Sequence, residues 1–256
     1  VENALDAGAR SIRVEVEGGG RRLIRITDDG SGIPADEAAL AFARHATSKI
    51  RQIEDLDSIQ TLGFRGEALA SIASVAHVTL ITRIREAAAG VQIRMEGGRL
   101  ADQRAVGVPH GTQITMENLF YNTPARLKFM KADATERRHI DTVITRYAMA
   151  YPGVRFSLAQ DGRVTFSTTG SGALADVLVE ALGLDIMREM LPIAPGPSGP
   201  IGVTGYTSTP SLNRNTRGYI TLFVNGRHIQ DSSLNYALTQ GYHTLIPADR
   251  YPVPVL

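Results

Sequence analysis

The sequence predicts an α/β fold of the α+β type, a two-layer sandwich in which helices cover one face of a mostly antiparallel sheet. Three observations support this prediction. Several segments alternate apolar and polar residues, as half-buried strands do. Segments with a helical spacing of apolar residues separate them. At 256 residues, the chain is long enough to bury roughly 70–75% of its unfolded surface without disulfides or metals.

The strand pattern is clearest in Ile12, Val14 and Val16, which are interleaved with charged residues. The glycines at 18–20 then turn the chain. By the same alternation we expect strands at residues 12–16, 23–27, 78–82, 91–95, 114–116, 156–158 and 164–166. Asp161-Gly162 predicts a tight hairpin between the last two of these strands.

Helices are expected where apolar residues recur at helical spacing and where start or stop residues frame a segment. Gly8 ends the first of them, and Pro34 is a favoured first helical residue. The expected helices cover residues 1–7, 34–43, 68–75, 134–151, 174–182 and 233–241. The buried face of the fourth helix is expected to consist of Ile140, Val143, Ile144 and Tyr147. Residues 45–62 lack clean periodicity, so we expect a mobile lid there.

A glycine-serine-glycine segment at 170–172 is the best candidate linker. It divides the chain into two expected domains, residues 1–172 and 173–256. The second domain is the smaller, with strands expected near 202–207 and 219–224. Because Val1 lies inside an expected helix and Leu256 inside an expected strand, we expect both domains to be truncated at the chain ends.

Composition excludes several classes of site. The absence of cysteine excludes disulfides, thiolate metal ligands and cysteine nucleophiles, and is consistent with a reducing cytoplasm. With 27 basic and 26 acidic residues, the formal net charge of +1 gives no general argument for nucleic acid binding. No apolar run approaches the roughly 18 residues of a membrane-spanning helix, so we expect a cytoplasmic protein with no membrane partner.

A candidate phosphate site lies in the segment Leu62-Gly63-Phe64-Arg65-Gly66-Glu67-Ala68-Leu69. Two glycines bracket an arginine, and a helix is expected directly after them. The unpaired N–H groups and the positive dipole end of such a helix start suit a phosphate. Arg65, and Lys49 upstream, can neutralise phosphate charge. The alternatives are a solvated surface lysine and a surface ion pair of the arginine.

A second candidate site begins where the strand at 23–27 ends, in Asp28-Asp29-Gly30-Ser31-Gly32. A carboxylate at Asp28 can accept a hydrogen from the exocyclic amino group of adenine, which would favour ATP over GTP. Gly30 and Gly32 allow the backbone to approach a base closely. The alternative is an ordinary turn at the end of a strand, because Asp and Gly are common in turns.

Six segments together resemble the MutL family of mismatch-repair ATPases, which share a superfamily with DNA gyrase, the Hsp90 chaperones and histidine kinases. The resemblance covers nearly the whole chain. Its segments are Asn3 to Gly8, Asp28 to Ile33, Arg44 to Lys49, Leu62 to Leu69, Phe120 to Arg126 and Val224 to Arg227. The fourth and fifth segments are the most specific. The resemblance implies an ATP-binding domain of the gyrase/Hsp90 type, followed by a transducer domain similar to the second domain of ribosomal protein S5.

The resemblance implies that ATP and Mg²⁺ bind to this chain. Asn3 is implied as the side-chain ligand of Mg²⁺, which prefers oxygen donors and shares phosphate oxygens. Asp28 and Thr112 are implied as the contacts to adenine. The full set of implied nucleotide contacts is Asn3, Asp28, Gly30, Gly32, Lys49, Leu62, Gly63, Arg65, Gly66 and Thr112.

No catalytic residue is assigned within the chain. In the superfamily, a glutamate about four residues before the magnesium asparagine activates the attacking water, and that position precedes Val1. Glu2 lies about 100° from Asn3 round the helix, so it does not take this role. The family's lysine that reaches the γ-phosphate lies in a His-Pro-Ala-Lys segment, which this sequence lacks. We therefore expect these 256 residues alone to bind ATP weakly and hydrolyse it poorly.

The resemblance further implies an ATP-dependent homodimer that links a MutS-type mismatch-recognition protein to downstream repair, with weak, largely non-specific contact to DNA. A basic cluster suits such contact, and a solvated helix face is its alternative. The cluster consists of Arg126, Lys128, Lys131, Arg137 and Arg138. Two other functions stay open: another ATPase of the superfamily, such as a type II topoisomerase subunit, and a nucleotide-gated scaffold that does not hydrolyse ATP.

Overall fold

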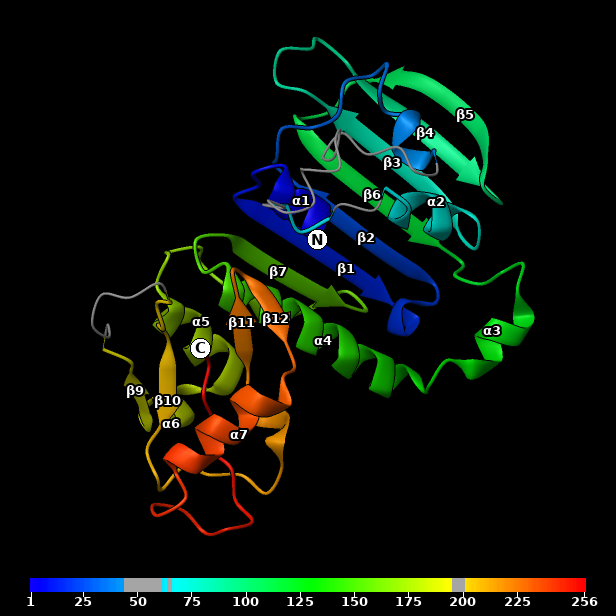
Figure 1. Ribbon diagram of the computed structural model, residues 1–256. Helices are drawn as coiled ribbons and strands as arrows, with labels where there is room; N and C mark the ends of the chain where they lie inside the picture. Colours follow the sequence, from blue (N-terminus) through cyan, green and yellow to red (C-terminus); the bar gives the residue numbers. More distant parts are fainter. Residues whose placement is uncertain (44–60, 64–65, 195–200) are drawn as a thin grey trace. The chain divides into compact units, whose positions relative to one another are not determined.

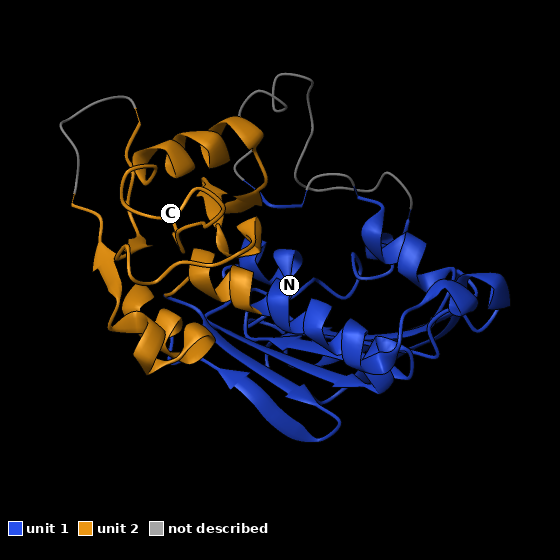
Figure 2. Cartoon of the chain, turned by 90° about the horizontal axis from the view of Figure 1, so that it is seen from below, with its two compact units in different colours: residues 1–144, 153–170 blue, residues 145–152, 171–256 orange. Residues whose placement is uncertain are grey.

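A computed structural model describes residues 1–43, 61–63, 66–194 and 201–256 (Figure 1). The chain forms two compact units (Figure 2). Unit 1 contains residues 1–144 and 153–170, and unit 2 contains residues 145–152 and 171–256. The chain thus changes unit close to Gly172, the expected end of the first domain, but the end of one long helix also belongs to unit 2. The expected lid lies outside the described residues, apart from Thr61 and Leu62.

Unit 1 is built on an eight-stranded sheet with the order β5-β4-β3-β6-β2-β1-β7-β8. Its strands are β1 (Ser11–Glu17), β2 (Leu23–Asp28), β3 (His77–Arg83), β4 (Gly90–Glu96), β5 (Arg99–Val106), β6 (Gly111–Glu117), β7 (Arg155–Gln160) and β8 (Arg163–Ser167). All neighbours pair antiparallel except β1 and β7, which run parallel. The mostly antiparallel sheet and the β7–β8 hairpin confirm the expectation.

One face of this sheet packs against helical elements. Along β3, residues 78, 80 and 82 are buried and the residues between them are partly exposed. Figure 2 shows helices of unit 1 on one side of its sheet. The core cluster joins Ala38, Phe42 and Ala73 to apolar residues of β3 and β4. The helical elements are α1 (Glu2–Asp6), η1 (Gly18–Gly20), η2 (Leu40–Phe42), α2 (Ala68–Ala73), α3 (Pro124–Phe129) and α4 (Asp133–Ala150), which continues into unit 2.

Unit 2 is a smaller mixed unit. Its elements are α5 (Leu174–Leu182), α6 (Leu184–Met187), β9 (Met190–Pro192), β10 (Tyr206–Ser208), η4 (Arg217–Tyr219), β11 (Leu222–Val224), β12 (Arg227–Ile229) and α7 (Ser232–Gly241). Two antiparallel pairs form, β9 with β10 and β11 with β12. Val255 forms β-bridges with Tyr206 of β10 and with Thr221, which directly precedes β11. The end of the chain is therefore bonded to both parts of unit 2. No helix in the described parts of the chain has the length and apolarity to cross a membrane.

The expected helix over 34–43 is wrong. The backbone there makes short turns, with Glu37 N–H donating to Pro34 O and Leu40 N–H donating to Glu37 O, and only η2 is regular. Within residues 34–43, Ala38 and Phe42 are the buried side chains. Helices in proteins are stabilised mainly by packing of an apolar face. Two buried side chains provide too little packing to stabilise a longer helix here.

The buried face expected for α4 is partly wrong. Val143 is 47% exposed, whereas Ile144 and Ala148 are buried. β5 has no counterpart among the expected strands. It is an edge strand whose residues are nearly all exposed, so its sequence lacks the alternation that marks a half-buried strand.

Candidate functional site

Asp28 is the last residue of β2, at the edge of the sheet where β1 and β6 begin. It lies opposite Ile12 of β1 and Thr112 of β6 in the sheet register. Its Oδ1 accepts a hydrogen bond from the backbone N–H of Gly30 at 3.0 Å. Burial raises the pKa of Asp28, and backbone hydrogen bonds from Gly30 and Thr112 oppose that shift. A partly desolvated carboxyl group at a strand end is a strong acceptor for a ligand hydrogen.

Three glycines near Asp28 allow backbone segments to approach one another. A Cβ at Gly32, whose φ is +75°, would lie 2.2 Å from the carbonyl oxygen of Arg83. A Cβ at Gly111, with φ +113°, would lie 2.1 Å from the carbonyl oxygen of Asp28. Gly30 is buried, and a Cβ there would lie 2.8 Å from Cβ of Ala7. In this structure the glycines therefore fit the loop to the protein's own backbone around Asp28.

Thr82 connects Thr112 to the glycine loop, a role that the sequence analysis missed. Its Oγ1 accepts the N–H of Ile33 at 2.8 Å and lies 3.1 Å from Oγ1 of Thr112. It also lies within hydrogen-bond distance of the carbonyl oxygen of Gly111, at 3.1 Å. Thr82 is only 1% exposed. The available signal was a hydroxyl residue in phase with Val78 and Leu80, at a position where the alternation requires an apolar side chain.

The end of α1 joins this region to the expected phosphate segment. The carbonyl oxygen of Ala7 accepts the N–H of Ser31 at 3.0 Å. The carboxylate of Asp6 accepts the N–H groups of Leu62 at 2.8 Å and Gly63 at 3.0 Å. Asp6 was also absent from the expected set of residues. Segments that are distant in sequence therefore meet at one end of a five-residue helix.

The remaining expected residues are placed as follows. Asn3 lies on α1 and is exposed. Gly66, with φ +63°, precedes α2 closely. Lys49 and Arg65 lie outside the described residues. The structure therefore brings Asp28, Gly30, Gly32 and Thr112 into one region, and it links Leu62 and Gly63 to the helix that carries Asn3.

The donor chemistry of α1 suits Mg²⁺ that is shared with phosphates. Asn3 provides one exposed amide side chain with an oxygen donor. The described part of the chain has no group of three or more His, Asp or Glu residues arranged to hold a metal. Mg²⁺ commonly keeps waters and binds through one or two protein groups plus substrate phosphates, so a single asparagine ligand is compatible with it.

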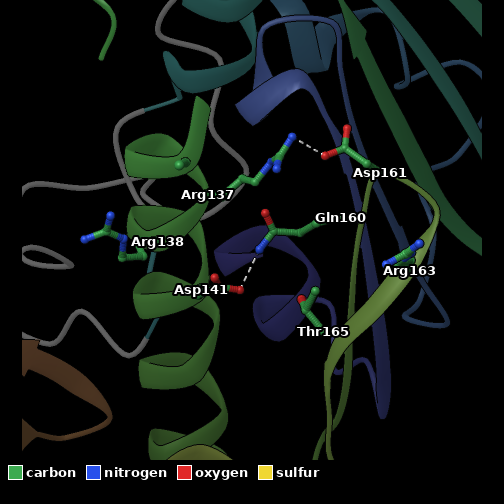
Figure 3. Close-up of a pocket in the computed structure, with 8 residues that line it drawn as sticks. Arg137, Arg138, Asp141, Gln160, Asp161, Arg163 and Thr165 are labelled. Atoms are coloured by element: carbon green, nitrogen blue, oxygen red, sulfur yellow. Dashed lines mark hydrogen bonds and ion pairs between the residues drawn. The ribbon is translucent and has the colours of Figure 1, made fainter. Parts of the chain in front are cut away.

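A separate polar hollow of about 680 Å³ lies between α4 and the β7–β8 hairpin (Figure 3). Arg137 forms an ion pair with Asp161, and Nε2 of Gln160 donates to Oδ1 of Asp141 at 2.6 Å. The ion pair neutralises one charge of the expected basic cluster. The other four members are exposed: Arg126, Lys128, Lys131 and Arg138. None of the expected nucleotide contacts that the structure describes lines this hollow.

Two protein families match separate parts of the chain. Residues 1–117 match the family described as "Histidine kinase-, DNA gyrase B-, and HSP90-like ATPase". Residues 178–256 match the family described as "DNA mismatch repair protein, C-terminal domain". The first match includes Asp28, Thr112 and the end of α1, and the second covers most of unit 2.

Similar full-length relatives are DNA mismatch repair proteins MutL. The protein of Desulforamulus reducens is 49% identical over all of this chain and 40% of its own length. That of Geobacter sulfurreducens is 46% identical over all of this chain and 42% of its own length. The chain therefore spans about 40% of the length of the curated relatives that it matches.

Solved structures agree with both the fold and the family. The Aquifex aeolicus MutL ATPase domain complexed with ADP is 30% identical, with a TM-score of 0.67 over 93% of this chain and 83% of that one. The N-terminal domain of a DNA repair protein has a TM-score of 0.80 over 98% of this chain and 78% of that one. At 24% identity, the second likeness shows the fold alone.

Proposed function

Because the chain belongs to the MutL family of DNA mismatch repair proteins and contains its ATPase-type domain, we propose that it binds ATP at Asp28 and the end of α1. The observation that carries this proposal is the surroundings of Asp28. A partly buried carboxylate lies directly opposite Thr112 in the sheet register, beside a loop whose glycines allow close contact with the neighbouring backbone. The ADP complex of the similar Aquifex aeolicus domain supports an adenine nucleotide as the ligand.

At the base end, we propose that Asp28 accepts a hydrogen from the exocyclic amino group of adenine. Guanine has a carbonyl oxygen at the equivalent ring position. This oxygen has no hydrogen to donate, and the carboxylate would repel its partial negative charge. Thr112 offers a hydroxyl group that can both donate and accept. Thr82 holds that hydroxyl group from behind, at 3.1 Å. The pair Asp28 and Thr112 would therefore select adenine over guanine.

At the phosphate end, we propose that Asn3 binds Mg²⁺ and that the segment from Leu62 to Gly66 follows the phosphates, with Lys49 and Arg65 contributing positive charge. Mg²⁺, when bound, neutralises phosphate charge and orients the phosphates. Within the chain, α1 provides Asn3 and also holds Leu62 and Gly63 through Asp6. One short helix would thus serve both the metal and the phosphate segment.

For the whole protein, we propose an ATP-gated homodimer that transmits a signal from a MutS-type protein to downstream repair factors. The γ-phosphate would supply contacts that offset the entropy of ordering a lid, and hydrolysis would release them. Weak, salt-dependent contact of the exposed basic residues with DNA fits this role. A DNA-repair function and the bacterial relatives support a cytoplasmic location.

The first test compares the binding of a non-hydrolysable ATP analogue with Mg²⁺ to the wild type and to Asp28→Asn, by titration calorimetry. We expect the substitution to weaken binding about tenfold or more, because a charged hydrogen-bond acceptor is lost. Asp36→Asn makes the same chemical change at an exposed residue and is the control, with unchanged affinity. Equal affinity of Asp28→Asn and the wild type would refute the site.

A second test separates an ATPase from a scaffold. Sizing after addition of the analogue would detect a dimer, and binding without dimerisation would favour the scaffold for these 256 residues.

We also propose that this polypeptide alone hydrolyses ATP slowly, because it contains neither the general-base glutamate nor the γ-phosphate lysine of the family pattern. Single-turnover hydrolysis at the rate of a full-length MutL would contradict that.

A further inference from the structure

Asp6 makes a two-pronged contact with a segment more than fifty residues away in sequence. Its Oδ1 accepts the backbone N–H of Leu62 at 2.8 Å, and its Oδ2 accepts the N–H of Gly63 at 3.0 Å. Each carboxylate oxygen therefore has its own donor, and the two donors are consecutive in the chain. A contact of this kind fixes both the position and the orientation of the peptide plane between them.

The contact joins two parts of the candidate nucleotide site. Asp6 is the last residue of α1 and lies three positions after Asn3, so both project from the same side of the helix. Leu62 and Gly63 begin the segment that the sequence assigns to phosphate. The residue after Asp6, Ala7, holds Ser31 of the glycine loop. The end of α1 is thus the place where the backbone of both segments is fixed.

The two amide hydrogens are already used in this contact. A phosphate oxygen could take them only by displacing a carboxylate, and a carboxylate beside a phosphate is repelled by it. Leu62 and Gly63 therefore cannot donate these hydrogens to a phosphate while Asp6 holds them. Their contribution to phosphate binding then depends on where Asp6 holds the backbone.

We propose that Asp6 is a positioning residue for the polyphosphate of the nucleotide. Its carboxylate holds the Leu62–Gly63 peptide at the end of α1, beside the helix that carries Asn3, and so presets the backbone at the start of the phosphate segment. The adenine contacts are held by other residues, since Gly30 bonds the carboxylate of Asp28 and Thr82 bonds the hydroxyl group of Thr112. This proposal rests on the proposed ATP site.

The test measures two ligands on the full-length protein, a non-hydrolysable ATP analogue with Mg²⁺ and adenosine. For Asp6→Ala we expect the affinity for the analogue to fall about tenfold or more, and the affinity for adenosine to change by less than about twofold. Asp6→Asn keeps one acceptor oxygen and should fall between the wild type and Asp6→Ala. Asp36→Asn is the control and should change neither affinity.

The outcomes distinguish this proposal from the proposed function. If the wild type binds neither ligand, the ATP site itself is wrong and the role of Asp6 fails with it. If the wild type binds both, an unchanged or higher affinity of Asp6→Ala for the analogue overturns the positioning role alone. An equal loss for adenosine would show a general structural role instead and would also overturn it.

Hydrogen exchange provides a second measurement that does not depend on ligand binding. In the nucleotide-free full-length protein, a peptide that includes residues 61–63 should exchange faster in Asp6→Ala than in the wild type. Peptides that cover β3 should exchange equally in both proteins. Equal exchange of the 61–63 peptide would show that the carboxylate does not hold this backbone, and would overturn the proposal even if Asp6→Ala lowered affinity.

Discussion

Asp28 meets two opposing requirements. Burial raises the pKa of its carboxyl group, so ionisation of Asp28 in the folded protein costs stability. A ligand amino group, by contrast, binds best to the ionised form, which accepts hydrogen bonds most strongly. Ionisation of Asp28 therefore reduces the stability of the free protein, whereas the proposed binding of adenine would require the ionised form.

This conflict predicts a pH-dependent effect of Asp28→Asn on stability. Because the folded state binds the Asp28 proton more tightly than the unfolded state, the wild type loses stability as the pH rises from the ordinary value of 3.8 through the raised pKa. Asparagine has no such loss. The free energy of unfolding of the variant, measured with urea at pH 4.5 to 7, should increase relative to the wild type as the pH rises. A difference that is independent of pH would contradict this.

Thr82 predicts a contrast between two substitutions. Thr82→Val leaves the N–H of Ile33 without its acceptor and removes the partner of the Thr112 hydroxyl, at a cost of about 1–3 kcal/mol. Thr82→Ser keeps the hydroxyl group and loses only one methyl group, at a cost of about 1 kcal/mol. The valine variant should be less stable in urea unfolding and should bind adenosine more weakly in titration than the serine variant. If the two variants bind adenosine equally, the hydroxyl group of Thr82 does not support the base site.

At this scale, the sequence predicted residues whose chemistry is visible in a short motif. Asp28 and the two glycines after it lie within five residues of one another, and Thr112, which follows a glycine, pairs with Asp28 in the sheet. Asp6 and Thr82 could not be assigned from a motif, because each acts through backbone N–H groups that only the fold brings to it. Almost every residue has a backbone N–H group, so the residue type of the donor does not reveal such a contact.

Among the elements, strands whose sequence alternates apolar and polar residues were predictable. β1, β3 and β4 alternate buried and more exposed residues and were expected, whereas the exposed edge strand β5 was not. Pro34 favours a helix start, but within residues 34–43 only Ala38 and Phe42 are buried, which is too little packing to hold a helix. Local preference therefore identified an element only where packing agreed with it.

The loop after β2 predicts a strong effect of Gly32→Ala. At φ +75° an alanine is strained, and its Cβ would lie 2.2 Å from the carbonyl oxygen of Arg83 in β3. We expect a loss of about 2 kcal/mol or more, seen as a fall in Tm of about 5 °C or more. Gly107→Ala is the control, because its added Cβ would meet nothing within 4 Å. A Gly32→Ala protein as stable as the control would show that this loop does not need its close approach to β3.

For the whole molecule, the two-part organisation was predictable but the assignment of α4 was not. The glycine-rich segment at 170–172 marks the point where unit 1 ends. Residues 145–152 belong to unit 2, although most of α4 belongs to unit 1. A continuous helical pattern does not reveal that its two ends pack with different neighbours. The similarity of unit 2 to a ribosomal S5-type domain stays a prediction.

The central claim is that an adenine nucleotide and Mg²⁺ bind in unit 1, between Asp28 and the end of α1. The most direct measurement is a crystal structure of this chain with a non-hydrolysable ATP analogue and Mg²⁺. We predict the adenine amino group within hydrogen-bond distance of the Asp28 carboxylate, Mg²⁺ on Asn3, and Asp6 still bound to the N–H groups of Leu62 and Gly63. Well-defined density for the analogue at any other place, with Asp28 free of contact to it, would contradict the account.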